Sequence, residues 1–287
     1  MITVQCPAKV NLTLKIKNKR PDGFHNIESI MQTISLYDYL TVDVKPSVNF
    51  EIKLSGNNPD IPYDERNLVY KAAMLFFDTA TNQIQRQGYE VNIYIDKHIP
   101  IAAGLAGGST DAAGTLLALN EIFDKPFGKN QLHELCAKLG SDLNVCLEGG
   151  KLFCKGRGEI IEPMEFEEFE LSLIKPENLG ISAKEAYGKF AQKNKFKELI
   201  RSFAYSLIRY SNNNYKKRKT FFNDLEWAII DDYKELQTIR KIYPKSMMSG
   251  SGSTYFIIGD TFESLEGYRI FNNLKSENKG CCIIKRS

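Results

Sequence analysis

A glycine-rich stretch at residues 102–113, AAGLAGGSTDAA, carries the clearest chemical signal in this sequence. Its three glycines allow the backbone to approach a ligand closely, and Ser109 and Thr110 add two hydroxyl groups. Apolar residues at helical spacing follow, so the stretch would lie at a helix N-terminus, where backbone N–H groups are unpaired and carry partial positive charge. Such a terminus can hold phosphate oxygens without a cationic side chain.

The same stretch also fits a tight turn into a helix, and by itself it does not distinguish the two alternatives. It is not a Walker A motif, because no Gly-Lys-Ser/Thr sequence follows, and it lacks the GxGxxG spacing of a dinucleotide site. A second glycine run, MSGSGST at 248–254, precedes an expected strand, where a bulge or a tight hairpin explains it equally well. The two runs together favour a site for several phosphates.

Three ionisable residues are further candidates. Lys9 lies in the middle of an apolar alternation, on the polar face of the expected strand, where a lysine usually faces solvent. Asp142, in GSDLNV, would lie in a first helical turn, where an aspartate usually only stabilises the helix by interacting with its dipole. The same dipole and a nearby cation would also keep the carboxylate ionised and available as a base. His25, in DGFH, is most simply a loop histidine that hydrogen-bonds to its own turn.

Composition excludes several classes of function. The 38 Lys and Arg residues against 35 Asp and Glu residues give a net charge of only +3, which offers no electrostatic case for a nucleic-acid or membrane partner. Six cysteines without a CxxC pair, accompanied by three histidines, suggest neither a zinc site nor a disulfide framework. No signal segment or membrane span is visible, so we expect a cytoplasmic protein with reduced thiols.

The elements that would position these residues indicate an α+β fold. Even-numbered apolar residues from 4 to 16 predict a strand with one buried face, and its polar face would carry Lys9 and Asn11 side by side. Pro7 predicts an edge, a bulge or a strand start. Alternating patterns predict an antiparallel meander of strands at 40–44, 48–54 and 91–95, interrupted by a helix at 67–85.

The rest of the chain follows a different pattern. A helix is expected directly after the glycine stretch and another up to Gly140, with Ser141 placed to cap the next helix. A domain boundary is expected at 154–163. Beyond it we expect strands at 170–174, 253–258 and 281–284 and helices at 182–190, 196–210, 224–243 and 262–273, with the helices on one sheet face. The tract at 210–219, YSNNNYKKRK, reads as an exposed polar loop.

Five blocks together resemble the GHMP kinases: PAKVNLTLKI, RPDGFHNIESIMQTI, IPIAAGLAGGSTDAAGTLLALN, LGSDLNVCLEGG and MMSGSGST. The joining of AKVNL to DGFH is most similar to the branch of that family that phosphorylates the 2-hydroxyl of 4-diphosphocytidyl-2-C-methyl-D-erythritol with ATP, in non-mevalonate isoprenoid biosynthesis. The resemblance implies a two-domain α+β GHMP kinase fold with the active site in the cleft between the domains. Residues 1–157 would carry the ATP loop and the catalytic pair, and residues 158–287 would form a ferredoxin-like domain.

The resemblance also implies roles for single residues. Asp142 would be the base that takes the proton of the substrate hydroxyl, and Lys9 would keep Asp142 ionised and offset charge on the transferred phosphoryl group. The loop that would hold the phosphates of ATP consists of Pro100, Ile101, Ala102, Ala103, Gly104, Leu105, Ala106, Gly107, Gly108, Ser109 and Thr110. Within it, the hydroxyl of Ser109 or Thr110 would contact a phosphate or Mg²⁺. Lys97, Asn67 and Leu68 would lie near the adenine. No protein ligand set for the metal is implied.

For the other substrate, which would carry a cytidine diphosphate moiety, Asn11 and His25 match positions that hold the methylerythritol and the cytosine. Phe24 and Tyr187 match an aromatic pair that encloses the cytosine ring. The second glycine loop, Ser249, Gly250, Ser251 and Gly252, would approach the substrate diphosphate or brace the nucleotide loop. We expect a monomer or a weak homodimer.

Four residues depart from the pattern of the family. Ala106 stands at a usual glycine, Asn144 at a usual proline, Phe24 at a frequent tyrosine, and Ala183 at a threonine for which Ser182 could substitute. None of them is Lys9 or Asp142. Two alternatives stay open: another GHMP small-molecule kinase, of the mevalonate or homoserine type, and a nucleotide-binding protein without transfer activity.

Overall fold

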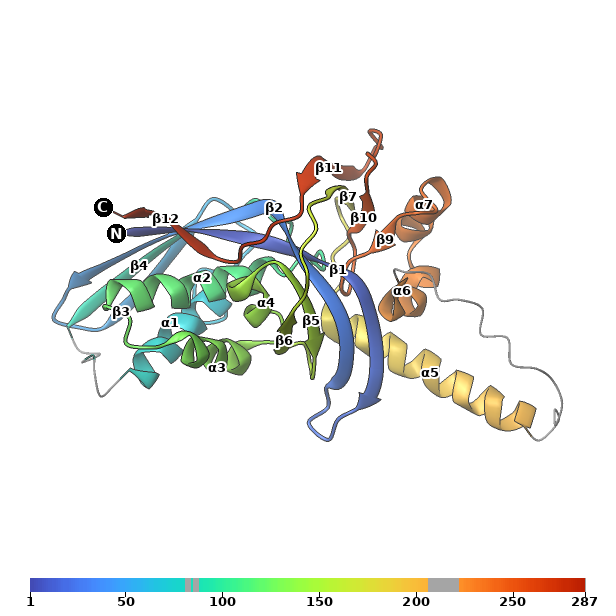
Figure 1. The fold of residues 1–287 in the computed structure, drawn as a ribbon, viewed down its shortest axis with the longest axis horizontal. Helices are drawn as coiled ribbons and strands as arrows, with labels where there is room; N and C mark the ends of the chain where they lie inside the picture. The colour runs from blue at the N-terminus through green and yellow to red at the C-terminus, as the bar shows by residue number, and fades with distance from the viewer. Residues whose placement is uncertain (81–83, 85–87, 206–221, 287) are drawn as a thin grey trace.

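The computed structural model describes residues 1–80, 84, 88–205 and 222–286. Helices and strands are mixed along the chain, and the strands form two separate sheets (Figure 1). The predicted α+β class is therefore confirmed. The predicted polar tract at 210–219 lies outside the described residues.

The larger sheet is built on one long antiparallel pair of strands near the middle of the molecule (Figure 1). Its described strands are β1 (Ile2–Lys19), β2 (His25–Pro46), β3 (Glu51–Gly56), β4 (Tyr89–Asp96), β5 (Lys151–Lys155), β6 (Ile160–Pro163), β8 (Phe222–Asn223) and β12 (Cys282–Arg286). Strand β12 pairs with β1, which brings the last strand of the chain beside the first. The strands predicted in the first hundred residues are all present, but β3 lies beside β4 and runs parallel to it. The prediction of a fully antiparallel meander was wrong because α1 returns the chain to the same end of the sheet between these two strands.

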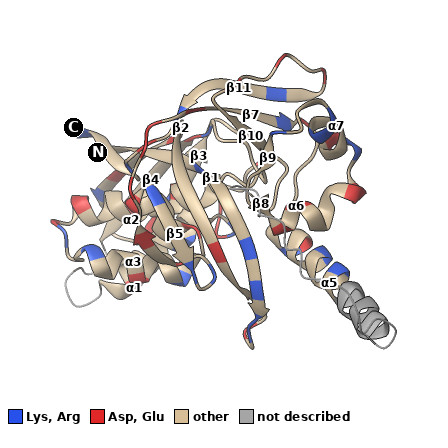
Figure 2. Ribbon diagram, turned by 45° about the vertical axis from the view of Figure 1, so that its right-hand side comes forward, with Lys and Arg blue, Asp and Glu red and all other residues tan. Residues whose placement is uncertain are grey.

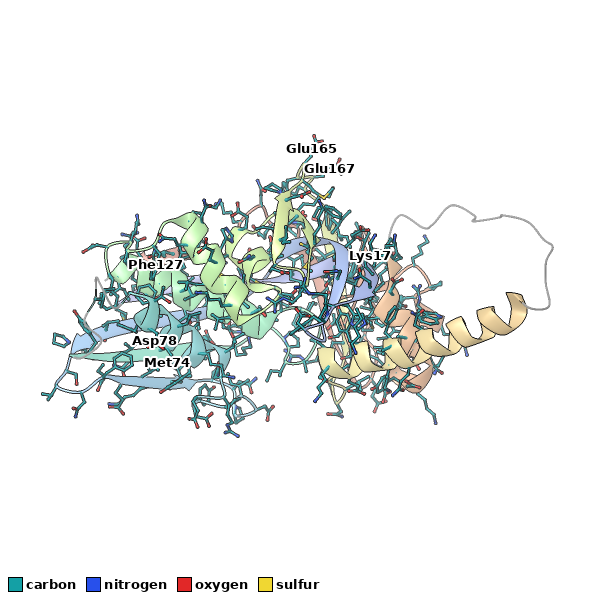
Figure 3. All side chains as sticks on the ribbon, turned by 90° about the horizontal axis from the view of Figure 1, so that it is seen from below. Lys17, Met74, Asp78, Phe127, Glu165 and Glu167 are labelled. Atoms are coloured by element: carbon teal, nitrogen blue, oxygen red, sulfur yellow. The ribbon has the colours of Figure 1, made fainter. Side chains whose placement is uncertain are left out.

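Four helices cover one face of this sheet: α1 (Leu68–Thr79), α2 (Gly107–Ile122), α3 (Lys129–Leu139) and α4 (Leu143–Glu148) (Figure 1). Helix α2 packs closely on β1, since a Cβ added at Gly114 would lie 2.4 Å from the Cys6 sulfur. Phe127 packs in the same helical layer, edge-on to Phe76 (Figure 3). Gly140 ends α3 as predicted, whereas α4 is preceded by Asp142 in the N-cap position, so the predicted cap at Ser141 was wrong.

A bulge between Pro7 and Ala8 changes which face of β1 each side chain occupies. Before the bulge, Val4 and Cys6 pack with α1 and α2. After it, Ala8 and Val10 pack with the second sheet, although they too are even-numbered. The prediction of one continuous buried face from 4 to 16 was therefore wrong: the register with β2 shifts between Pro7, which pairs with Tyr37, and Ala8, which pairs with Ile34, and residues 6–12 are buried on both faces.

The second sheet is antiparallel, in the order β11 (Tyr268–Lys275), β7 (Glu170–Pro176), β10 (Tyr255–Ile258) and β9 (Met247–Met248). Its helices are α5 (Ala183–Tyr205), α6 (Asp224–Ile229) and α7 (Lys234–Ile242), with a 3₁₀ turn η1 (Ile230–Asp232) between the last two. Two predicted helices at 182–190 and 196–210 are one helix as far as Tyr205, because neither glycine nor proline interrupts the residues between them. The predicted helix at 224–243 is instead divided by η1.

The helix predicted at 262–273 was wrong. Residues 268–275 form the edge strand β11, in which Ile270 and Phe271 pair with β7. Gly267, with φ +80°, breaks any helix that would begin at Phe262, and the aromatic and β-branched residues that follow favour a strand.

Hydrogen bonding is continuous around the predicted division at residue 157. Strand β6 follows the division and pairs with β5, and β12 returns to the larger sheet. The division into 1–157 and 158–287 and the ferredoxin-like description stay predictions. Glu165 and Glu167, in the connection from β6 to β7, point outward (Figure 3).

In the part of the chain that Figure 2 colours by charge, basic and acidic residues alternate along the ribbon, and neither sign is confined to one region. All six cysteines are free thiols. In the part of the chain that the structure describes, no helix has both the length and the apolar character needed to cross a membrane.

Candidate functional site

The ammonium group of Lys9 is the centre of the candidate site. It donates to Asn11 Oδ1 at 2.6 Å and to the Gly104 carbonyl oxygen at 3.1 Å, and it lies 3.2 Å from Asp142 Oδ2. These contacts match the three donors of a lysine, so the group is fixed in direction. The Lys9 side chain is 2% exposed and that of Asp142 is 27% exposed. The cation is thus inside the protein while the carboxylate is accessible.

The local structure explains how these two groups meet. The bulge at Pro7 and Ala8 turns Lys9 and Asn11 away from the second sheet. Asp142 precedes α4, and its side chain makes no capping bond, so its carboxylate remains available to the lysine. A buried lysine is costly unless it is paired and hydrogen-bonded, and both conditions are met here. A lysine on a strand usually faces solvent, but Lys9 does not.

A short network joins Lys9 to the second glycine loop. Asn11 donates from Nδ2 to Ser29 Oγ at 2.9 Å, and the Asn11 backbone N–H donates to Ser249 Oγ at 3.2 Å. Ser249 in turn donates to the Gly104 carbonyl at 2.9 Å. Asn11 and Ser249 are buried, so these two predicted substrate contacts are engaged within the protein in this structure.

The two glycine loops interlock by backbone contact. A Cβ at Gly104, whose φ is +73°, would lie 2.1 Å from the Ser249 carbonyl oxygen, and a Cβ at Gly250, with φ +53°, would lie 2.9 Å from that of Gly104. Thr254 N also donates to the Ala103 carbonyl at 3.3 Å. Glycine is required at these positions by both space and backbone conformation. The loop at 248–254 thus packs directly against the loop before α2, and its two predicted roles toward the substrate diphosphate and the nucleotide loop stay predictions.

Ser251 and Gly252, the last predicted site residues of the loop at 248–254, are also held by hydrogen bonds. Ser251 Oγ donates to the Ile181 carbonyl at 3.4 Å, and Gly252 N donates to the Ser249 carbonyl at 2.9 Å. Asn223, at the N-cap of α6, donates to the carbonyls of Met248 and Gly250, both at 2.8 Å. The loop is therefore anchored from three sides.

The N-terminus of α2 is open to a ligand. A Cβ at Gly108 would meet nothing within 4 Å, and the N-cap residue Ala106 makes no side-chain capping bond. Ser109 is half-buried, whereas the Thr110 hydroxyl lies buried beside the Cys281 sulfur at 3.5 Å. Of the two predicted hydroxyl contacts, Ser109 is thus the accessible one.

The loop before α2 contains two alanines in the left-handed region, Ala102 at φ +49° and Ala106 at φ +62°. The left-handed conformation costs free energy for any residue with a Cβ atom, whereas glycine adopts it freely. Ala106 is the position at which the sequence departs from the usual glycine. Ala106 therefore adopts a left-handed backbone conformation, which is strained for alanine.

Lys97 lies beneath the first turn of α2. Its ammonium is 2.5 Å from Asp38 Oδ2 and 2.6 Å from Asp111 Oδ2, and all three side chains are buried. Burial opposes the charge of Lys97, but the two carboxylates outweigh it and raise the lysine pKa. Asp38 also accepts from the backbone N–H groups of His98 and Ile99. The cluster fastens both ends of the segment 97–111.

The other two residues predicted near the adenine begin α1. Asn67 is the N-cap: its Oδ1 accepts from Val69 N at 2.9 Å, and its Nδ2 donates to the Pro62 carbonyl at 2.7 Å. Leu68 packs against the core under the helices. No contact of these side chains tests the predicted role.

Aromatic residues lie at the tip of the β1–β2 hairpin and on α5. His25 stacks on Tyr187, with ring centroids 5.4 Å apart and an angle of 18° between planes. Burial and then the charge of Asp142 raise the pKa of Tyr187. Phe24 is half-exposed and lies under Arg157. The structure thus pairs Tyr187 with His25, and not directly with Phe24.

Sequence reasoning missed Asp38, Asp111 and Ser29. Asp111 is within the glycine-rich stretch itself, where a carboxylate inside an apolar helical pattern signals a buried partner. Asp38 is flanked by apolar and aromatic residues in β2 and offers the same signal. Ser29 has no such signal, because its role follows only from the pairing of β1 with β2.

One cavity lies outside the candidate site, and the described residues offer no metal site. A cavity of about 450 Å³ among α2, α3 and α4, lined in part by Phe127, Leu132 and Cys281, contains none of the predicted site residues. Within the described ranges, no group of three or more His, Cys, Asp or Glu side chains is arranged to hold a metal ion.

The chain is similar in sequence to known proteins. A family model described as the GHMP kinases N terminal domain matches residues 67–150. A relative from Clostridium perfringens, named 4-diphosphocytidyl-2-C-methyl-D-erythritol kinase, is 38% identical over 283 residues, which are 95% of this chain and 93% of the relative. A relative of the same name from Prochlorococcus marinus is 36% identical over an alignment of 312 residues, which covers 99% of this chain and 95% of the relative. The chain belongs to the 4-diphosphocytidyl-2-C-methyl-D-erythritol kinase family of the GHMP kinases.

Solved structures agree with this assignment. A crystal structure of 4-(cytidine 5'-diphospho)-2C-methyl-D-erythritol kinase matches with a TM-score of 0.70 at 26% identity, covering 96% of this chain and 100% of the other. Homoserine kinase from Cytophaga hutchinsonii matches with a TM-score of 0.67 at 15% identity, which shows a shared fold. The predicted GHMP kinase fold is confirmed, and membership of this kinase family implies the use of ATP.

Proposed function

We propose that this GHMP kinase transfers the γ-phosphoryl group of MgATP to the 2-hydroxyl of 4-diphosphocytidyl-2-C-methyl-D-erythritol, in the non-mevalonate route to isoprenoid precursors. The observation that carries the proposal is the pair formed by buried Lys9 and accessible Asp142, beside the glycine loop that leads into the open N-terminus of α2. The similarity to full-length relatives of that name supports the choice of substrate.

In the proposed reaction, Asp142 accepts the proton of the substrate hydroxyl. The oxygen forms a bond to the γ-phosphorus while the bond between that phosphorus and the β,γ-bridging oxygen breaks, and ADP leaves. Lys9 stabilises the ionised Asp142 and the negative charge near the transferred group. The contacts of Lys9 to Asn11 and Gly104 hold its ammonium in place, so little reorganisation accompanies the step.

The N–H groups at the start of α2 and the Ser109 hydroxyl would hold the phosphates of ATP. The open space at Gly108 fits such a ligand. Mg²⁺ bound to these phosphates would supply charge neutralisation. We propose that Lys97, with Asn67 and Leu68, borders the adenine.

His25 and Tyr187, together with Phe24, are the proposed pyrimidine site. Burial and then the charge of Lys19 lower the pKa of His25, so its imidazole is neutral at pH 7. A neutral imidazole has one donor and one acceptor, which suits the mixed hydrogen-bonding edge of cytosine. Stacking would supply affinity, and these hydrogen bonds would supply selectivity.

An ADP-release assay tests the proposal. We expect ATP-dependent turnover with the cytidyl substrate and none with mevalonate or homoserine. Turnover on a substrate that lacks cytidine would favour another GHMP kinase activity. ATP binding without ADP release on any of the three substrates would favour a nucleotide-binding protein that lacks transfer activity.

A further inference from the structure

We propose that Arg157 is a positioning residue for the base-bearing substrate, because it holds the ring of Phe24 in a fixed orientation. This inference rests on the proposed function, in which Phe24 contributes to the cytosine site. Arg157 lies in the turn between β5 and β6, far from Phe24 in sequence, and the sequence alone assigned it no role.

The contact itself is a cation–π pair. The Arg157 Cζ lies over the Phe24 ring, 5.0 Å from its centroid. Phe24 is 51% exposed, so the guanidinium leaves a large part of the ring surface accessible. Phenylalanine has no hydroxyl group to anchor its ring, and the orientation of an exposed ring depends on what packs against it. Arg157 supplies that contact.

Arg157 is itself held rigidly. Its Nη2 donates to the Ala137 carbonyl oxygen, near the end of α3, at 3.0 Å. Its Nε lies 3.7 Å from Glu159 Oε1, and its backbone N–H donates to Glu159 Oε2 at 2.6 Å. The guanidinium is therefore fixed to the helical layer, and it packs from there against the exposed ring of Phe24 in the β1–β2 hairpin.

Two glycines with positive φ values set the backbone conformation of the turn that carries Arg157. Gly156 and Gly158 flank it with φ values of +68° and +127°. These conformations are open to glycine and rare for other residues, so the side chain between them is directed by the backbone. A planar guanidinium can stack on an aromatic face, whereas the compact ammonium of lysine cannot. The geometry thus favours arginine at this position.

A double-mutant cycle between Arg157→Ala and Phe24→Ala tests the inference. We expect Arg157→Ala to raise the KM for the cytidyl substrate, and the Kd for cytidine 5'-diphosphate as a binding probe, by about 2- to 5-fold, the size of one partly exposed cation–π contact. The KM for ATP and the kcat should not change. In the Phe24→Ala background, Arg157→Ala should have no further effect.

Two further variants separate this role from a general effect on folding. Arg157→Lys keeps the charge without the planar group and should restore binding only in part. Arg269→Ala removes a similar pair, since Arg269 Cζ lies 5.3 Å from the Phe271 ring centroid on the second sheet, and it should leave both KM values unchanged.

Equal effects of Arg157→Ala in both backgrounds, or a parallel rise in the KM for ATP, would show that Arg157 does not act through Phe24. If Arg157→Ala does not fold, Arg157→Lys decides the question: full retention of cytidyl affinity overturns the inference. Absence of wild-type turnover on the cytidyl substrate would instead reject the proposed function, and would do so before any variant is compared.

Discussion

The carboxylate of Asp142 lies 3.2 Å from the ammonium of Lys9, although one precedes a short helix and the other is in the middle of a strand. The lysine is buried and the carboxylate is accessible, so the pair presents a base to solvent and keeps its counter-ion inside. This arrangement suits a reaction in which a proton is taken from an alcohol while negative charge develops nearby.

Removing either member of this pair should abolish catalysis with little loss of substrate binding. We expect Asp142→Asn and Lys9→Met to lower kcat by about 100-fold or more, the effect typical of losing one preorganised charged group. Both replacements keep the approximate side-chain volume, and circular dichroism should confirm the fold. Near-normal kcat in a folded variant would remove that residue from the mechanism.

Alanine at Gly104 should disrupt the loop. The added Cβ would lie 2.1 Å from the Ser249 carbonyl oxygen, at a φ of +73°. We expect a loss of at least about 2 kcal/mol in the free energy of unfolding, measured by urea denaturation. Gly108→Ala is the matched control, because its Cβ meets nothing within 4 Å, and it should cost far less stability. Equal losses in the two variants would contradict the interlocked loops.

Glycine at Ala106 should stabilise the protein. Ala106 has a φ of +62°, so the wild type pays the penalty of a left-handed residue. We expect Ala106→Gly to add about 0.5–1 kcal/mol, since this penalty exceeds the extra backbone entropy of glycine in the unfolded chain. Ala103→Gly is the control: that residue is buried without a positive φ, and its change should destabilise. A lower Tm for Ala106→Gly would show that the loop is not strained there.

Asp111 should make stability depend on pH. Burial, only partly offset by Lys97, raises the pKa of Asp111 to about 7. Because the folded pKa exceeds the unfolded value of about 4, the folded state retains a proton that the unfolded state releases. The contribution of this group is thus fully present below pH 4 and falls as the pH rises to about 7.

Asp111→Asn removes this titration. The free energy of unfolding of the variant, relative to the wild type, should therefore increase between pH 4 and pH 7 and be flat above that range. Urea titrations at intervals of one pH unit would measure it. A pH-independent difference would show that Asp111 stays ionised beside Lys97 and Asp38 throughout this range.

The sequence by itself determined a great deal here. Three local features predicted the segments of the candidate site: glycine at 104, 107 and 108 before an apolar helical pattern, a lysine in an apolar strand, and an aspartate before a short helix. Local residue preferences carry this information, because glycine permits unusual backbone angles and apolar spacing reveals helices and strands.

The tertiary structure decided which groups meet. The bulge after Pro7 reverses the alternation of β1 and thereby aims Lys9 at Asp142. No local pattern fixes where the register of two paired strands shifts, since this depends on how β1 and β2 pair. The cluster of Asp38, Lys97 and Asp111 and the contact of Arg157 with Phe24 likewise join residues from separate elements. Such contacts are properties of the packed fold, because their energies arise only when burial removes the groups from water and brings them within a few ångströms.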